Sequence, residues 1–121
     1  MNKEKIVIIS TIGLENPEKA TLPFVFATAA QSMDVEVVMF LQSEAVVLSK
    51  KGEAENVRAH GLLPLKELLD NFYDEGGKLY ICAPCIKERG ISAKDLVQGA
   101  EPAAAGTLVD EVISAKSVLT Y

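Results

Sequence analysis

The stretch that decides the fold is KLYICAPCIKER, residues 78–89. Its first five residues follow two glycines and predict a buried strand over 78–82. Residues 84–89 predict a short helix that ends at Gly90, because glycine favours the position just after a helix. A strand that leads directly into a helix is the repeating unit of a sheet covered by helices.

More strands are predicted on both sides of this unit. Residues 5–10 (KIVIIS) and 34–41 (DVEVVMFL) are nearly continuous apolar runs, as expected of strands covered on both faces. Residues 97–101 predict a short fourth strand, and residues 116–120 (KSVLT) predict a fifth.

Helices are predicted between these strands. A helix over 17–32 begins with Asn16 as its cap and a proline at its first position. Others are predicted at 43–50, after Leu63-Pro64, and from Pro102 onward. The alternation predicts an α/β fold, a single domain over residues 1–121 in which helices cover both faces of a parallel sheet, a three-layer sandwich.

Composition excludes several classes of protein. The chain has 121 residues, 49% apolar and 24% charged, which is ordinary for one globular domain and unlike a disordered chain. The net charge of −5 gives an acidic surface that repels phosphate backbones and anionic lipids. We therefore expect neither nucleic acid nor membrane partners.

The N-terminus and the cysteines predict a cytoplasmic protein. The apolar run at 6–9 is shorter than the about 7–15 residues of a signal-peptide core. No segment approaches the roughly 20 apolar residues of a membrane helix. The only two cysteines lie three residues apart, whereas a disulfide framework needs more of them at wider spacing.

Cys82 and Cys85 form a CxxC motif at the predicted strand-to-helix junction, and we interpret them as the catalytic residues. The positive end of a helix favours thiolate over thiol and lowers the pKa of a cysteine there. Lys87 and Arg89 add positive charge nearby. Cysteine is often simply buried and inert, but two at this spacing on this junction favour a reactive site over that alternative.

Three further residues are weaker candidates. His60 is either a solvated loop residue or a cap over the thiols; as the only histidine, it also makes a zinc site improbable, since two thiolates need two more ligands. Thr11 and Gly13 follow the first predicted strand and could contact phosphate, although they lack the glycine-rich pattern of a phosphate loop. We predict no cofactor and no metal.

The CAPC motif is similar to that of thioredoxins, but its placement argues against that fold. Thioredoxin-like proteins carry the motif after an early strand, and a proline faces it just before a later strand. Here the motif lies two thirds of the way along the chain, and Pro102, the only later proline, is expected to precede a helix.

The chain resembles a known family over nearly its whole length. The stretch KLYIC-APCIKERGI, residues 78–91, is similar to the DsrE/DsrF-like family of sulfur-relay proteins, whose active cysteine ends a strand and is followed by a basic residue and a glycine at the same offsets. Cys82 is the matching position, and Cys85 places the chain in a CxxC-containing subset. The resemblance extends over NPEKAT (16–21), PLKELL (64–69), DLV (95–97), GAE (99–101) and GTLV (106–109).

This resemblance implies a compact α/β fold with a mainly parallel five-stranded sheet. It also implies homo-oligomers, commonly trimers or hexamers, and sulfur donor and acceptor proteins as partners. The cysteine at position 82 would carry sulfur as a persulfide. Cys85, absent from the matching segment of the relay subunits, would tune or resolve that persulfide.

Three functions stay open at this point. The leading hypothesis is a cytoplasmic sulfur carrier with a sulfurtransferase-like role, which needs no turnover of its own. The second is a dithiol–disulfide oxidoreductase or peroxiredoxin-like protein that uses the CxxC pair. The third is a non-catalytic oligomeric binding module.

Overall fold

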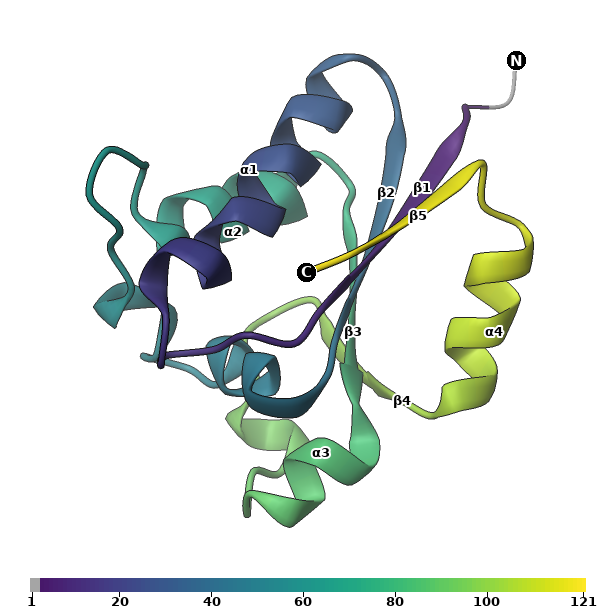
Figure 1. Ribbon diagram of the computed structural model, residues 1–121. Helices are drawn as coiled ribbons and strands as arrows, with labels where there is room; N and C mark the ends of the chain where they lie inside the picture. The colour runs from purple at the N-terminus through teal and green to yellow at the C-terminus, as the bar shows by residue number, and fades with distance from the viewer. Residues whose placement is uncertain (1–2) are drawn as a thin grey trace.

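The computed structural model describes residues 3–121 and contains one sheet of five parallel strands in the order β4-β3-β2-β1-β5 (Figure 1). The predicted parallel α/β fold is confirmed. The strands are β1 (Lys5–Ser10), β2 (Glu36–Leu41), β3 (Lys78–Cys82), β4 (Ala100–Ala103) and β5 (Ser117–Thr120).

Helices lie on both faces of this sheet and give it three layers. α1 and α2 cover one face, α4 lies on the other, and α3 lies at the end where β3 terminates (Figure 1). The helices are α1 (Pro17–Ser32), α2 (Leu65–Asp74), α3 (Ala83–Glu88) and α4 (Ala105–Ile113), with short 3-10 helices η1 (Ser43–Ser49), η2 (Ala54–Asn56) and η3 (Ala93–Asp95).

Local chemistry explains where most elements begin. Asn16 caps α1 as predicted, because its side chain accepts a hydrogen bond from the Lys19 N–H at 3.0 Å. β2 begins at Glu36, two residues later than predicted, because Asp34 belongs to the turn that ends α1. Asp34 has a φ of 66°, and its N–H donates to the carbonyl of Gln31.

The prediction around Pro102 was wrong. Pro102 lies inside β4, and α4 begins only at Ala105. The predicted strand started too early, because the Val97 N–H donates instead to the Ser49 carbonyl at 2.8 Å. A proline is tolerated in β4 because this strand is at the edge of the sheet and needs ladder bonds on one side only. Of the two arguments that separated this chain from thioredoxins, only the late position of the motif stands.

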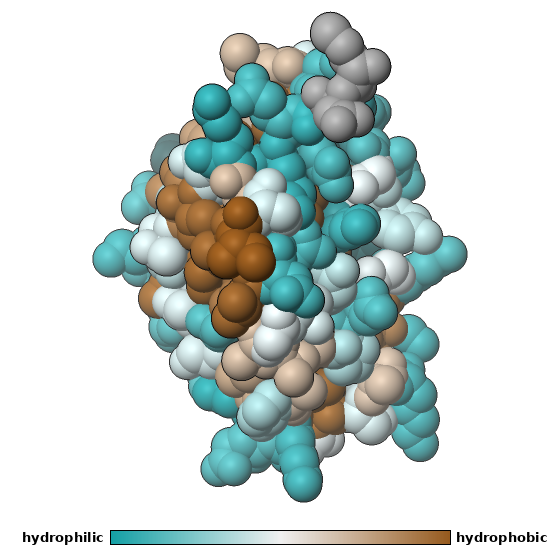
Figure 2. Space-filling model, turned by 90° about the vertical axis from the view of Figure 1, so that its right-hand side faces the viewer, coloured by the Kyte–Doolittle hydropathy of each residue, from teal (hydrophilic) through white to brown (hydrophobic). Residues whose placement is uncertain are grey.

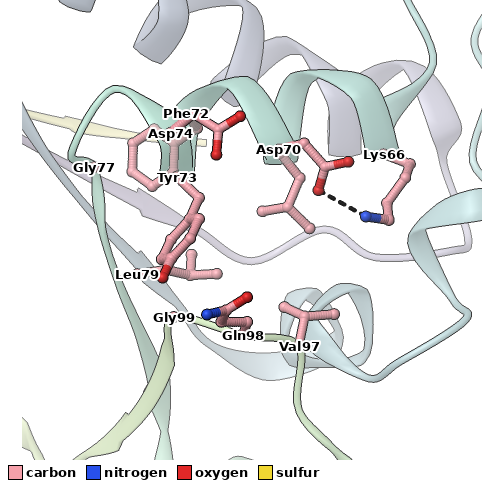
Figure 3. Close-up of a pocket in the computed structure, with 11 residues that line it drawn as sticks. Lys66, Asp70, Phe72, Tyr73, Asp74, Gly77, Leu79, Val97, Gln98 and Gly99 are labelled. Atoms are coloured by element: carbon pink, nitrogen blue, oxygen red, sulfur yellow. Dashed lines mark hydrogen bonds and ion pairs between the residues drawn. The ribbon is translucent and has the colours of Figure 1, made fainter.

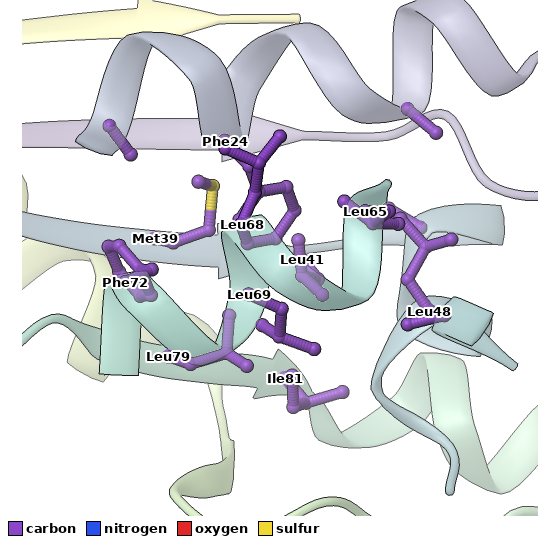
Figure 4. Packing of buried hydrophobic residues seen from close by; sticks show 14 of the residues in the cluster. Phe24, Met39, Leu41, Leu48, Leu65, Leu68, Leu69, Phe72, Leu79 and Ile81 are labelled. Carbon is purple, nitrogen blue, oxygen red and sulfur yellow. The ribbon is translucent and has the colours of Figure 1, made fainter. Parts of the chain in front are cut away.

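The main core lies between the sheet and the layer formed by α1 and α2 (Figure 4). Phe24 of α1 meets Phe72 of α2 edge to face, with ring centroids 6.0 Å apart. The Phe72 ring fills the space in which a side chain at Gly77 would lie, so a glycine is needed there. The strands supply buried aliphatic side chains beneath the helices, among them Met39, Leu41, Leu79 and Ile81.

The opposite face is covered by α4, which has no buried residue. Lys5 Nζ lies 2.8 Å from Glu111 Oε1, and the Tyr80 hydroxyl donates to Glu111 Oε2 at 3.2 Å. Figure 2 looks onto this side of the molecule and shows an apolar patch on its surface. The exposed large apolar residues of α4 and β5 are Val109, Ile113 and Val118.

No helix within residues 3–121 combines the length and the apolar character needed to cross a bilayer.

Candidate functional site

The two cysteines lie at the carboxyl end of β3, where open α/β sheets usually place their functional sites. Cys82 is the last residue of the strand and the N-cap of α3, and Cys85 lies in the first turn of that helix. Their Cα atoms are 5.2 Å apart and their sulfur atoms are paired as a disulfide. Both residues are half-buried.

Each sulfur atom accepts a backbone hydrogen bond. The Cys85 N–H donates to Cys82 Sγ at 3.4 Å, so the strand-to-helix turn itself supplies the donor. The Ser43 N–H donates to Cys85 Sγ at 3.3 Å, from the segment that joins β2 to η1. Donors in these positions favour a thiolate over a neutral thiol, because a charged acceptor makes a stronger hydrogen bond.

The two basic residues of α3 differ in what they contact. Arg89 donates through Nε and Nη2 to Glu44 Oε1 at 3.0 and 2.7 Å, and through Nη1 to the Cys85 carbonyl at 3.1 Å. Its guanidinium is thus paired with a carboxylate, and it touches the backbone of Cys85. Lys87 is exposed.

The Thr11 hydroxyl and the Gly13 N–H both donate hydrogen bonds to other groups of the protein. The Thr11 hydroxyl donates to the Tyr121 carbonyl at 2.9 Å, and the Gly13 N–H donates to Glu15 Oε1 at 2.9 Å. A phosphate at Gly13 would have to displace the Glu15 carboxylate. Gly13 instead packs against the segment next to the cysteines, since a Cβ at this position would collide with the Glu44 carbonyl.

His60 is exposed in the loop between η2 and α2. No hydrogen bond or ion pair joins it to either cysteine in the described part of the chain. Within residues 3–121, no group of three or more His, Cys, Asp or Glu side chains is arranged to hold a metal ion.

Ser43 and Glu44 are site residues that sequence reasoning missed. The donor at Ser43 is a backbone N–H, which any residue other than proline carries, so no side-chain pattern could indicate it. Glu44 is 45 positions from Arg89, and only the adjacent placement of β2 and β3 in the sheet brings them together.

A separate cavity of about 360 Å³ lies between α2 and the loop before β4 (Figure 3). Figure 3 shows Tyr73 and Asp70 of α2 on one side and Gln98 and Val97 on the other. None of the predicted site residues lines it, so it is distinct from the cysteine pair.

The family model described as "DsrE/DsrF-like family" matches residues 4–121 of the chain. A similar protein is an uncharacterised protein of Methanocaldococcus jannaschii, 33% identical over 107 residues; the match covers 88% of this chain but only 39% of that relative. An uncharacterised protein of Methanopyrus kandleri is 32% identical over 121 residues, covering 98% of this chain and 97% of the relative.

Among solved structures, the crystal structure of the YchN protein from Escherichia coli superposes with a TM-score of 0.84. It covers 98% of this chain and 99% of its own, at 24% sequence identity. At that identity the likeness shows a shared fold, which is the five-stranded parallel α/β arrangement described above.

Proposed function

The chain belongs to the DsrE/DsrF-like family, and we propose that it is a cytoplasmic sulfur carrier in which Cys82 holds sulfane sulfur as a persulfide. The observation that carries this proposal is the position of Cys82, which ends β3 and accepts the Cys85 N–H at 3.4 Å. This donor favours the thiolate, which is the form that attacks sulfur electrophiles.

Loading follows from thiolate chemistry. The Cys82 thiolate attacks the terminal sulfur of a donor persulfide, R–S–SH. A new bond forms between Cys82 Sγ and that sulfur, the donor S–S bond breaks, and its electron pair leaves on the thiolate RS⁻. The product is a Cys82 persulfide that can pass its outer sulfur to an acceptor thiol by the same step.

Cys85 gives this persulfide a second outcome. The Cys85 thiolate can attack Cys82 Sγ, which forms the Cys82–Cys85 disulfide and releases the outer sulfur as hydrosulfide. The sulfane sulfur is reduced and the two cysteine sulfurs are oxidised, so the step needs no further reactant. The 5.2 Å separation of the Cα atoms is compatible with this disulfide.

Mass spectrometry after incubation of the reduced protein with polysulfide tests the proposal. We expect an adduct of one sulfur atom on Cys82 that is abolished in Cys82→Ser. The matched control is Cys85→Ser, which should retain the adduct for longer, because it cannot resolve the persulfide. An adduct that survives Cys82→Ser, or none in the wild type, would contradict the proposal.

A dithiol–disulfide oxidoreductase is the second candidate, favoured by the pairing of the two sulfur atoms. This function requires a reversible disulfide with a physiological reduction potential. Titration against glutathione and dithiothreitol buffers, followed by alkylation of free thiols, would measure that potential. A disulfide that does not reform on oxidation would eliminate this candidate.

We also propose that copies of the chain assemble through the exposed side of α4, as a trimer or hexamer. Support comes from Val109 and Ile113, which are 56% and 77% exposed on a helix without buried residues. Sedimentation of the wild type should give the mass of an oligomer, and Ile113→Lys should reduce it. Equal sedimentation of both proteins as single chains would count against this assembly.

A further inference from the structure

The hydrogen-bond donor at Cys85 comes from an unusual backbone conformation. Ser43, whose N–H lies 3.3 Å from Cys85 Sγ, has a φ of 53° in the left-handed region. Residues with a side chain seldom adopt this region, so surrounding contacts must hold Ser43 there.

Two neighbours contact this segment. Arg89 binds the Glu44 carboxylate through Nε and Nη2 and the Cys85 carbonyl through Nη1, so one guanidinium ties the residue after Ser43 to Cys85 itself. In addition, the Glu44 carbonyl packs against Gly13 so closely that a Cβ at Gly13 would collide with it.

We propose that Glu44 and Arg89 are positioning residues that hold the Ser43 N–H against Cys85 Sγ and thereby stabilise the Cys85 thiolate. This inference rests on the proposed function, because it concerns the second thiol of the same pair. A disulfide or neutral thiol sulfur is a weak acceptor, whereas a thiolate is a charged one, so the fixed donor acts mainly on the ionised form.

A direct effect of charge on Cys85 is the competing explanation. Glu44 Oε1 lies 2.7 Å from Arg89 Nη2, so the two charges largely offset each other at the sulfur. The remaining effect of the ion pair is on position, because it holds the Ser43 N–H next to the sulfur. The ionisable groups on the elements packed against Cys85 are Glu44 on η1, Lys87, Glu88 and Arg89 at α3, and Lys78, Tyr80 and Cys82 on β3.

Stabilising the Cys85 thiolate protects the persulfide on Cys82. Internal resolution consumes that thiolate: Cys85 S⁻ attacks Cys82 Sγ, the Sγ–Sγ bond forms, the bond to the outer sulfur breaks, and its electron pair leaves on hydrosulfide. A more stable thiolate shifts this equilibrium back toward the persulfide. The Glu44–Arg89 pair would therefore favour a carrier over a protein that releases sulfide.

The pH profile of Cys85 alkylation distinguishes position from charge. In a Cys82→Ser background, Cys85 is the only thiol, and iodoacetamide reports its thiolate alone. Loss of one hydrogen bond to a charged acceptor is expected to raise the midpoint by about one pH unit, which is about tenfold slower alkylation below the midpoint. If the pair acts through position, this rise is expected for both Glu44→Ala and Arg89→Gln, since each removes the contact between the two side chains. If the charges act directly, the midpoint should fall for Glu44→Ala and rise for Arg89→Gln.

Matched controls carry the same changes of charge elsewhere. Glu88→Gln on α3 and Arg58→Gln in the loop before α2 alter exposed side chains and should move the midpoint far less. Arg89→Lys keeps the charge but not the three-donor geometry, so it should behave like Arg89→Gln. Opposite shifts for Glu44→Ala and Arg89→Gln, or a wild-type midpoint in both while circular dichroism shows them folded, would overturn the proposal.

A second readout links the positioning to sulfur transfer. With both cysteines present and at a pH above both alkylation midpoints, persulfide-loaded Glu44→Ala should release more hydrosulfide at equilibrium than the wild type, with an equilibrium constant about tenfold higher to match the thiolate shift. If Cys82 accepts no sulfur, the proposed function is wrong. The alkylation profiles would still test whether Glu44 and Arg89 position the Ser43 N–H. If the protein is loaded and both variants release as much as the wild type, the positioning is wrong.

Discussion

The two faces of the sheet are built in different ways. The face under α1 and α2 is closed by interlocking apolar side chains, with Phe72 fully buried against Phe24. The face under α4 also buries apolar strand residues such as Val38 and Phe40, but here Lys5, Glu111 and Tyr80 add polar contacts between the sheet and the helix. The helices of one layer thus bury side chains of their own, whereas α4 buries none.

Because of this difference, we expect one face to determine the stability of the fold and the other to be available to partners. α4 buries none of its own residues and keeps Val109 and Ile113 exposed, whereas α1 and α2 bury Phe24 and Phe72 against each other. The free energy of unfolding should therefore depend mainly on the α1–α2 face, while the α4 face should respond to pH and to other chains.

The largest expected effect is on the packed face. Phe72→Ala should destabilise the protein by about 3–5 kcal/mol, because it removes a fully buried ring and leaves a cavity beside Phe24. Urea unfolding followed by circular dichroism would measure the change.

Its comparator on the other face is Ile113→Ala. Since Ile113 is 77% exposed, this change should cost less than about 0.5 kcal/mol within a protomer. Equal losses for the two variants would remove the distinction between the faces. A loss for Ile113→Ala that grows with protein concentration would instead place α4 in an interface between copies.

The next effect is on the polar face. Glu111→Gln should cost about 2 kcal/mol at neutral pH, because it leaves Lys5 without its charged partner at a place where both side chains are less than one fifth exposed. The matched control is Glu101→Gln on the exposed side of β4, with an expected cost near zero.

The dependence of this difference on pH has a definite sign. Burial acts to raise the pKa of Glu111, but the hydrogen bond and charge of Lys5, the Tyr80 hydroxyl and the charge of Lys78 together lower it below the ordinary 4.5. A carboxyl with a lowered pKa stabilises the fold above its unfolded pKa and loses that contribution as pH falls through its folded pKa. The gap between wild type and Glu111→Gln should therefore persist down to pH 4.5 and narrow below it. A gap that widens in acid would refute this assignment.

A smaller effect on the polar face is expected of Tyr80→Phe, about 1 kcal/mol, since it removes one hydrogen bond and keeps the ring that packs against Phe40. Burial, together with the nearby Glu111 and Glu101 charges, raises the pKa of Tyr80 above 10.0. The phenol thus contributes fully below pH 10.0, and its contribution declines as pH rises through the folded pKa. Thermal unfolding across this range would test the loss; a Phe variant as stable as the wild type at neutral pH would show that the hydrogen bond contributes nothing.

The strands and the cysteine junction could be predicted because their signals are local. KIVIIS and KLYIC are short apolar runs, and both strands have the predicted bounds. The position of Pro102 could not be predicted in this way, because whether a proline is tolerated in a strand depends on whether that strand is at the edge of its sheet. Strand order is a property of the whole fold rather than of any segment.

Contacts between distant residues account for the rest. Arg89 was expected to supply positive charge to a thiolate, whereas its guanidinium binds Glu44 and the Cys85 carbonyl. Lys5 and Glu111 are 106 positions apart and meet because β1 lies next to β5 in the sheet, with α4 on that face. Neither the composition nor the spacing of residues in the sequence predicts such pairs.

The donor at Ser43 has a consequence for how the site can diverge over evolution. Because a main-chain N–H contacts Cys85 Sγ, the serine side chain can be replaced through mutation without loss of the contact. Proline alone removes the donor, and its fixed φ near −65° also conflicts with the 53° found at Ser43. An alignment of relatives could then show a variable column at this position while every member keeps the same hydrogen bond, so substitution rates would understate its importance.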